Sequence, residues 1–185
     1  MMTEIALNVL DVAQNSVRAK ATLIEIRVLA DTAADQMEIT IEDNGCGMTK
    51  EQIDQVSDPF FTTRTTRKVG LGVPFFKYSA ECTGGSFEIT SKVGEGTKVS
   101  ARYVLSSIDR MPLGDMAGTM HTLITFNTEI DFVYTYAVDG RQFVLDTREF
   151  KEILGGVALN TPEVSSYIEE YLVENTREVS AGVVF

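Results

Sequence analysis

The chain has 185 residues, a formal net charge of −11 at pH 7, 44% hydrophobic residues and 23% charged residues. These values are those of a globular protein with one core, or with one domain and a small extension. The acidic balance argues against a broad surface for nucleic acid or an anionic membrane, and no apolar run reaches the roughly 20 residues that span a bilayer.

The N-terminal residues show no signal-peptide pattern, so we expect a cytoplasmic protein. The two cysteines, Cys46 and Cys82, have neither the spacing of metal ligands nor that of a disulfide framework, which suits a reducing compartment. For Cys46 we expect a buried, inert thiol.

Residues 3–20 are predicted to form an amphipathic helix, because their apolar side chains recur at helical spacing. Asp11, Asn15 and Arg18 then fall on one face, about a turn apart. Carboxylate and carboxamide oxygens suit Mg²⁺ or a water held near it. For the helix alone, a solvated polar face is the simpler interpretation.

Two alternating segments, 23–29 and 37–42, are predicted to be strands of an antiparallel hairpin. The second strand leads into Asp43, which is followed by the spaced glycines Gly45 and Gly47. Such a turn lets a ligand come close to the backbone, and its carboxylate can accept a hydrogen bond from an exocyclic amine such as that of adenine. An ordinary Asp-Asn-Gly turn is the alternative.

A capping box of Thr49 and Gln52 predicts the start of another helix, which Pro59 ends. A basic loop follows, and its cations Arg64, Arg67 and Lys68 suit phosphate contacts or a solvated surface.

Gly70 and Gly72 come next, and Pro74 fits the first turn of a helix over residues 73–82. The start of a helix favours a phosphate, because its N–H groups are unpaired and its dipole is positive there. We expect Phe75, Phe76 and Tyr78 to pack inward. Strands at 87–90 and 97–105 complete an α+β fold, a two-layer α/β sandwich with helices on one face of a mixed sheet.

The motifs resemble the ATP-binding domain shared by DNA gyrase, Hsp90, sensor histidine kinases and MutL-type mismatch-repair ATPases. The resemblance covers about residues 3–105, and four motifs follow in order at domain-like spacing. They are LDVAQNSVRAKATLIEI (10–26), EDNGCGM (42–48), DPFFTTR with VGLGVPF (58–64 and 69–75), and GGSFEITSKVGEGTKVS (84–100).

The resemblance implies a Bergerat-type ATP-binding fold, with ATP and Mg²⁺ as ligands. Asn15 would bind the Mg²⁺ that bridges the phosphates, and Asp43 would accept the adenine amino group. The other implied contacts are Gly45, Gly47 and Thr97 near the purine, Thr63, Arg64 and Lys68 in a short lid over residues 58–68, and Gly70, Leu71 and Gly72 at the phosphates.

Asp11 departs from the pattern, because relatives that hydrolyse ATP carry Glu there as general base. The shorter carboxylate of Asp11 reaches less far toward the attacking water, so hydrolysis stays open while binding is expected. No phosphoacceptor histidine domain precedes the motifs, which makes a complete self-phosphorylating kinase an unfavoured interpretation.

The remaining residues are expected to comprise a connector (106–118) and a small α/β extension (119–185) after an ATP-binding domain (1–105). We predict strands at His121–Phe126, Phe132–Val138 and Gln142–Leu145, with a hairpin turn at Asp139-Gly140, and helices at 147–154 and from about Asn160 to about Glu178. His121 is expected to be an ordinary strand histidine. The extension either adds strands to the main sheet or forms a separate lobe.

Three functions fit these residues. The first is ATP and Mg²⁺ binding that acts on a partner protein, with slow hydrolysis or phosphotransfer. The second is a non-catalytic ATP-sensing module, and the third is an anti-sigma-type serine kinase. The partner is an unidentified protein, and a homodimer stays open; we expect no nucleic acid.

Overall fold

The computed structural model describes residues 3–57 and 72–185. Within these ranges, pairs of consecutive strands are separated by one or two helices. They are α1 (Ile5–Arg18), β1 (Leu23–Asp31), β2 (Gln36–Asp43), α2 (Lys50–Ser57), α3 (Gly72–Glu81), β3 (Ser86–Lys92), β4 (Gly96–Val104), α4 (Met116–Phe126), β5 (Asp131–Val138), β6 (Arg141–Asp146), α5 (Thr147–Leu154) and α6 (Pro162–Ser180).

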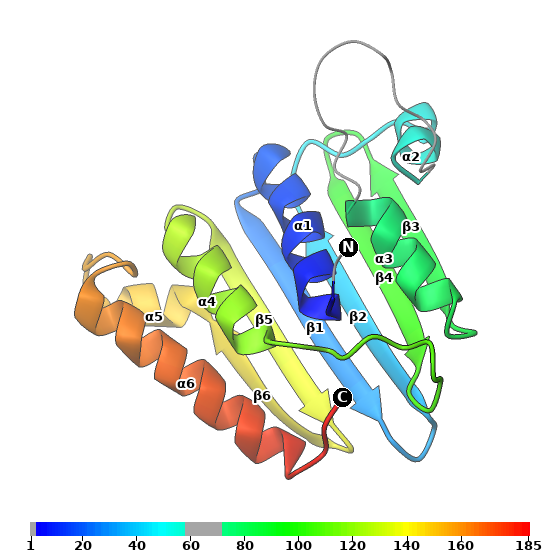
Figure 1. Ribbon diagram of the computed structural model, residues 1–185. Coiled ribbons are helices and arrows are strands. Elements are labelled where there is room, and N and C mark those ends of the chain that lie inside the picture. The colour runs from blue at the N-terminus through cyan, green and yellow to red at the C-terminus, as the bar shows by residue number, and fades with distance from the viewer. Residues whose placement is uncertain (1–2, 58–71) are drawn as a thin grey trace.

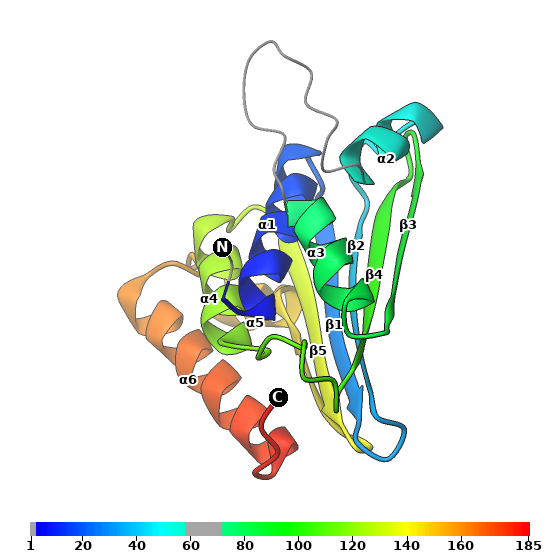
Figure 2. The ribbon, with the colours of Figure 1, turned by 45° about the vertical axis from the view of Figure 1, so that its right-hand side comes forward.

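The strands form one six-stranded sheet in the order β3-β4-β2-β1-β5-β6. Strands β1 and β5 are parallel, and the other neighbours are antiparallel, including the predicted hairpin of β1 and β2. Helices α1, α3, α4 and α6 lie on one face of this sheet (Figures 1 and 2). The predicted α+β fold, a two-layer sandwich with a mixed sheet, is therefore confirmed.

The core lies between the sheet and the helices. Alternate residues of each central strand are buried, as in β5, where Phe132, Tyr134 and Tyr136 are no more than 2% exposed. These three aromatic residues belong to the core. Burying a large apolar side chain contributes about 1.5–3 kcal/mol, so this layer supplies much of the stability.

The opposite face of the sheet is polar. On β2 and β4, Glu38 pairs with Arg102 at 2.8 Å, and Glu42 lies 3.6 Å from Lys98. The hydrogen bond from Arg102 is the main cause that lowers the pKa of Glu38. Half-exposed ion pairs of this kind contribute little to stability, but they explain why the helices cover only one face.

Strand β5 continues the main sheet, which decides between the two arrangements predicted for the extension. Its register places Asp131 opposite Leu23 of β1. At the β5–β6 turn, Asp139 and Gly140 have φ angles of 50° and 80°. Positive φ at both positions is the geometry expected of a two-residue hairpin, so this prediction is confirmed.

The strand predicted at His121–Phe126 is wrong, because these residues lie in helix α4. The side chain of Asp115 caps this helix by accepting a hydrogen bond from the N–H of Gly118 at 2.8 Å. Helix α4 therefore begins inside the segment predicted as a connector. Its buried residues recur every three or four positions, a helical pattern that the β-branched Thr and Ile residues of the run obscured; they are Met116, Ala117, Thr119, Met120, Leu123 and Ile124.

The orientation predicted for helix α3 is wrong at two residues. Phe76 is fully buried, but Phe75 is 43% exposed and Tyr78 is 70% exposed. Successive residues are rotated by about 100° around a helix, so Phe76 and Ala80 share the core-facing side while Phe75 and Tyr78 turn away. Two aromatic rings therefore lie on the surface of α3.

Helices α5 and α6 end the described chain. Asp146 caps α5 through a hydrogen bond from the N–H of Arg148, whereas the hydroxyl of Thr147, the first residue of α5, accepts from the N–H of Phe132 at 2.8 Å. Gly155 ends α5 in the left-handed conformation, which glycine adopts readily. None of the described helices is both long enough and apolar enough to cross a membrane.

Two buried tyrosines provide a test of the core. The hydroxyl of Tyr134 has no hydrogen-bond partner in the described residues, whereas that of Tyr103 shares a 2.9 Å hydrogen bond with Ser79. We expect Tyr134→Phe to raise the free energy of unfolding by about 1 kcal/mol and Tyr103→Phe to lower it by about 1 kcal/mol. Urea unfolding of both variants measures this, and a loss of stability in Tyr134→Phe would contradict it.

Candidate functional site

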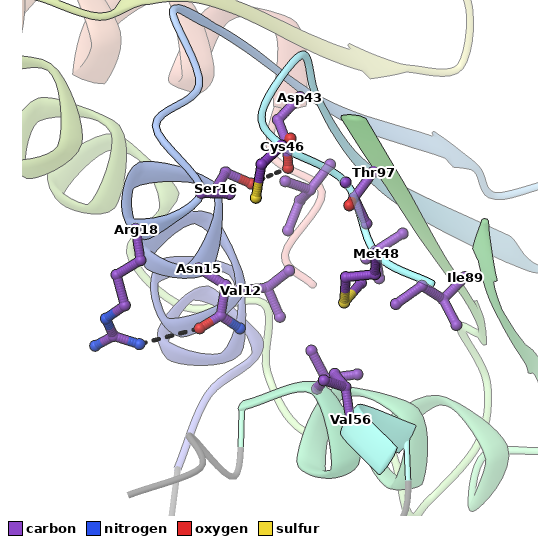
Figure 3. A pocket seen from close by; sticks show the side chains of 15 residues that line it. Val12, Asn15, Ser16, Arg18, Asp43, Cys46, Met48, Val56, Ile89 and Thr97 are labelled. Atoms are coloured by element: carbon purple, nitrogen blue, oxygen red, sulfur yellow. Dashed lines mark hydrogen bonds between the residues drawn. The ribbon is translucent and has the colours of Figure 1, made fainter. Parts of the chain in front are cut away.

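A cavity of about 310 Å³ lies between α1 and the ends of the strands on the helical face of the sheet (Figure 3). Its size is at the lower end of the range of small-molecule sites. Residues from α1, β2 and the turn after it, α2, α3, β3 and β4 line it: Val12, Asn15, Ser16, Arg18, Ala19, Ile41, Asp43, Cys46, Gly47, Met48, Val56, Val73, Ile89, Thr97 and Val99.

Asp43 is held in place at the end of β2. The hydroxyl of Ser16 donates a hydrogen bond to its Oδ2 at 2.5 Å (Figure 3). The N–H of Gly45 donates to its Oδ1 at 2.8 Å. Each carboxylate oxygen can accept a further hydrogen bond. The site therefore presents a carboxylate whose orientation is fixed and which can still accept from a ligand.

The turn after Asp43 is pressed against the protein itself. A Cβ added to Gly45 would lie 2.8 Å from the Cβ of Ala19, and one added to Gly47, where φ is +66°, would lie 1.9 Å from the carbonyl oxygen of Lys92. Both positions therefore need glycine for close packing, in addition to any approach of a ligand. Cys46, between them, is exposed and lines the cavity, so the expectation of a buried thiol is wrong.

Ser91 of β3 organises the side of the cavity opposite α1. Its hydroxyl accepts a hydrogen bond from the N–H of Met48 at 2.8 Å, shares one with the hydroxyl of Thr97 at 2.8 Å, and donates one to the carbonyl oxygen of Gly96 at 2.8 Å. Thr97 also lies opposite Asp43 in the register of β4 and β2. Ser91 thereby ties the turn after β2 to the pair of closing strands.

Asn15 and Asp11 occupy neighbouring turns of α1. Asn15 lines the cavity, and its Oδ1 accepts a hydrogen bond from Arg18 at 3.0 Å. Asp11 lies one turn before it, beside the start of α3, where a Cβ added to Gly72 would lie 2.7 Å from the Cβ of Asp11. Gly72 therefore lets α3 begin directly against α1.

Five of the predicted site residues lie outside the described residues: Thr63, Arg64, Lys68, Gly70 and Leu71. In the described ranges, no group of three His, Cys, Asp or Glu residues converges as a metal site. Asn15, which the sequence predicts as a ligand of Mg²⁺, lies within the described residues. This cation usually keeps several waters and phosphate oxygens as its other ligands.

Sequence reasoning missed Ser16, which lines the cavity, and Ser91, which holds the lining residues Met48 and Thr97 through hydrogen bonds. Ser16 follows the predicted ligand Asn15 directly, and its place on α1, one residue beyond the polar face, was the available signal. Ser91 precedes Val93-Gly94-Glu95-Gly96 in the closing hairpin, so its pairing with Thr97 could be found from the hairpin register.

The arrangement suits a flat ring with an amino group. Apolar side chains line both the helix and the sheet sides of the cavity, among them Val12, Ile41 and Val73. A planar base between such walls is removed from water, and the fixed carboxylate of Asp43 marks where a donor on the ring would bind. The residues present therefore fit a purine with an exocyclic amine.

A comparison with models of protein families identifies the family of this chain. The family model described as "Histidine kinase-, DNA gyrase B-, and HSP90-like ATPase" matches residues 2–107. The chain therefore belongs to this family, and residues 2–107 form a histidine-kinase-like ATPase domain of the Bergerat type, as the motifs indicated.

Curated relatives match the same part of the chain. It is 32% identical over 102 residues to a "Putative sensor protein" of Shewanella frigidimarina, covering 54% of this chain and 16% of that protein. It is also 32% identical over 105 residues to "Sensor protein kinase FleS" of Pseudomonas aeruginosa, covering 57% of this chain and 25% of that protein. The chain thus spans a quarter or less of the length of these relatives.

A solved structure shares the fold. "Crystal Structure of N terminal domain of a DNA repair protein" aligns with a TM-score of 0.53 and 16% sequence identity, covering 78% of this chain and 53% of that chain. At this identity the likeness concerns the fold alone, but the alignment extends past the part that the family model matches.

The three contacts of Ser91 lead to a prediction about stability. Ser91→Ala leaves the N–H of Met48 without its acceptor, so we expect the free energy of unfolding to fall by about 1–3 kcal/mol. Ser86→Ala, at an exposed position of the same strand, is the matched control and should change it by less than about 0.5 kcal/mol. Equal effects in urea unfolding would show that the Ser91 contacts contribute nothing specific.

Proposed function

We propose that this chain binds ATP with Mg²⁺ in the cavity between α1 and the sheet, and that it acts through a partner protein. The observation that carries the proposal is the carboxylate of Asp43, which the Ser16 hydroxyl and the Gly45 N–H hold at the wall of an otherwise apolar cavity. The membership of the chain in an ATPase family also supports ATP as the ligand.

Asp43 would select adenine. Two protein donors already occupy one acceptor position on each of its oxygens, so the remaining lone pairs can accept from the exocyclic amine directly or through a water. A guanine would present a carbonyl oxygen where adenine has this amine. Two acceptors would then face each other, and a water or a protonated carboxyl would be needed to avoid repulsion.

The phosphates would extend from the cavity toward Asn15 and the start of α3. Backbone N–H groups at the beginning of a helix are unpaired and favour an anion. Asn15 would contribute one oxygen ligand to Mg²⁺, and the bound cation would supply charge neutralisation for the phosphates. Asn15 already accepts from Arg18, which keeps its carboxamide oriented.

Asp11 decides between turnover and sensing. It lies against Gly72, at the point where α3 begins, and a carboxylate there can act as general base toward a water near the phosphates. The reach of an Asp is one methylene shorter than that of the Glu expected in relatives that hydrolyse ATP. We propose slow hydrolysis, and the short reach of Asp11 favours ATP sensing without turnover as the second candidate function.

A second protein would respond to whether this domain has bound nucleotide. The matched relatives carry the names of sensor proteins and of a sensor protein kinase, and they are several times longer than the aligned part. In this chain, residues beyond 107 add β5, β6 and three helices to the same sheet. We propose that a partner binds this ATPase domain and responds to its nucleotide state.

Calorimetry with ATP and Mg²⁺ tests the binding site. We expect Asp43→Asn to lower the affinity about 10- to 100-fold, because it removes a charge-assisted hydrogen bond and places the NH2 group of a carboxamide against the Ser16 hydroxyl or the Gly45 N–H. Glu42→Gln is the matched control, since Glu42 precedes Asp43 on β2 but points to the opposite face, toward Lys98.

Binding by wild type and Glu42→Gln, with weak binding by Asp43→Asn, supports the proposal. Absence of ATP binding by the wild-type chain would refute it. Equal losses of ATP affinity in both variants would show that the effect comes from the loss of one negative charge and not from the position of Asp43.

Phosphate release tests the role of Asp11. If Asp11 is the general base, Asp11→Asn should reduce hydrolysis at least about 100-fold while ATP affinity stays within about twofold. Asp11→Glu should raise the rate above wild type, because the longer side chain reaches further. A rate that is unchanged in both variants would exclude this role, and ATP binding without turnover would then favour the sensing function.

A further inference from the structure

A second cavity, of about 450 Å³, lies between α1, α3 and the segment that follows β4. Its described lining includes Asn8, Phe75, Tyr78, Cys82, Asp109 and Met111, none of which lines the first cavity. Figures 1 and 2 show this segment crossing below α1 on its way to α4, where the carbonyls of Pro112 and Leu113 accept the N–H groups of Ile5 and Ala6. The walls of the cavity are thus anchored to the helix.

Asn8 is one of the residues that line this cavity, and its carboxamide is unpaired within the described residues. The residue is fully buried, and within the described part of the chain neither its Nδ2 nor its Oδ1 has a hydrogen-bond partner. Its neighbour Ser79 is satisfied by the carbonyl of Phe76 and the hydroxyl of Tyr103. A buried amide without partners destabilises the folded state, so a group that pairs with it would be held strongly.

The mouth of the cavity has different chemistry. Phe75 and Tyr78 expose 43% and 70% of their surface there, and Asp109 supplies the one carboxylate among the described lining residues. Aromatic faces and a carboxylate together favour a flat ring with a positive charge. Burial and the charge of Asp109 raise the pKa of the Cys82 thiol, so Cys82 adds no negative charge at neutral pH.

We propose that this second cavity binds a small planar aromatic cation that carries a carboxamide. The carboxamide of the ligand would pair with that of Asn8, since each amide offers the donor and the acceptor that the other lacks. The ring would lie against Phe75 and Tyr78, with its charge near Asp109. This ligand class satisfies the buried amide, the exposed rings and the carboxylate at once.

The two cysteines of the chain permit a direct test, because Cys46 lines the first cavity and Cys82 lines the second. The probe is 1-methylnicotinamide, and alkylation of each thiol by iodoacetamide at about pH 8.5 is followed by mass spectrometry. We expect millimolar probe to slow alkylation of Cys82 at least threefold and to leave Cys46 unchanged. ATP with Mg²⁺ should protect Cys46 and leave Cys82 unchanged.

The contribution of Asn8 is tested with Asn8→Leu, which keeps a similar volume and removes the unpaired polar group. We expect a higher melting temperature than wild type and a loss of Cys82 protection, with at least a tenfold weaker probe affinity. Tyr78→Ala changes an exposed side chain and tests the mouth of the cavity independently of the core. Benzamide, which lacks the charge, and 1-methylnicotinate, which lacks the amide, should each protect Cys82 less than the probe.

The proposal is overturned if 1-methylnicotinamide gives no protection of Cys82, or if Asn8→Leu and Tyr78→Ala both retain full protection. A lower melting temperature in Asn8→Leu would also refute it, since the amide would then have a partner in solution. Displacement of the probe by ATP would place it in the first cavity. Cys46 reports on ATP separately, so failure of the nucleotide site and failure of this second site give different results.

Discussion

The close packing of other elements around helix α1 is the constraint on which both cavities depend. The sheet and helices α3 and α4 contact it, and the carbonyls of Pro112 and Leu113 accept hydrogen bonds from its first turn. Backbone groups at a helix start would otherwise be unpaired. Glycine permits the closest approach at two points, where Gly72 meets Asp11 and Gly45 meets Ala19. A Cβ at either position would lie within 3.0 Å of these α1 neighbours, so the packing against α1 would have to shift.

Polar groups at the two ends of α1 are treated in opposite ways. Ser16, near the C-terminal end, donates a hydrogen bond from its hydroxyl to Asp43 and so fixes the orientation of that carboxylate. Asn8, two turns earlier, is buried without any partner in the described chain. The first arrangement stabilises the free protein and prepares it for a ligand, whereas the second leaves stability to be gained on binding. Both residues belong to the one helix that contributes to the lining of both cavities.

The C-terminal residues complete the sheet that the ATPase domain begins. The family model ends at residue 107, yet β5 pairs with β1 over its whole length and places Ile24, Ile26 and Val28 in the interior. Without β5, strand β1 would be an edge strand with unpaired backbone groups. The residues beyond the family match are therefore part of the same core, and His121 of α4 links to Ser165 of α6 at 2.8 Å within their helical layer.

Local patterns determined much of this protein in advance. The periodicity of α1, the hairpin of β1 and β2, the Thr49–Gln52 capping box and the Asp139-Gly140 turn all depend on residues a few positions apart, and the structure contains each of them. The motifs also indicated the residues that meet at the first cavity, including Asn15, Asp43 and Thr97.

Only the tertiary structure decided which partners distant residues take: Ser16 bonds Asp43 across 27 positions, and Ser91 bonds Met48 across 43. The tertiary structure also decided that α4 is a helix, because its β-branched residues suit a strand but one helical face of the segment packs against the core. It likewise decided the exposure of Phe75 and Tyr78, whose apolar character alone would place them inside. Propensity acts within a turn or two of chain, whereas burial is set by what packs against a residue from elsewhere in the sequence.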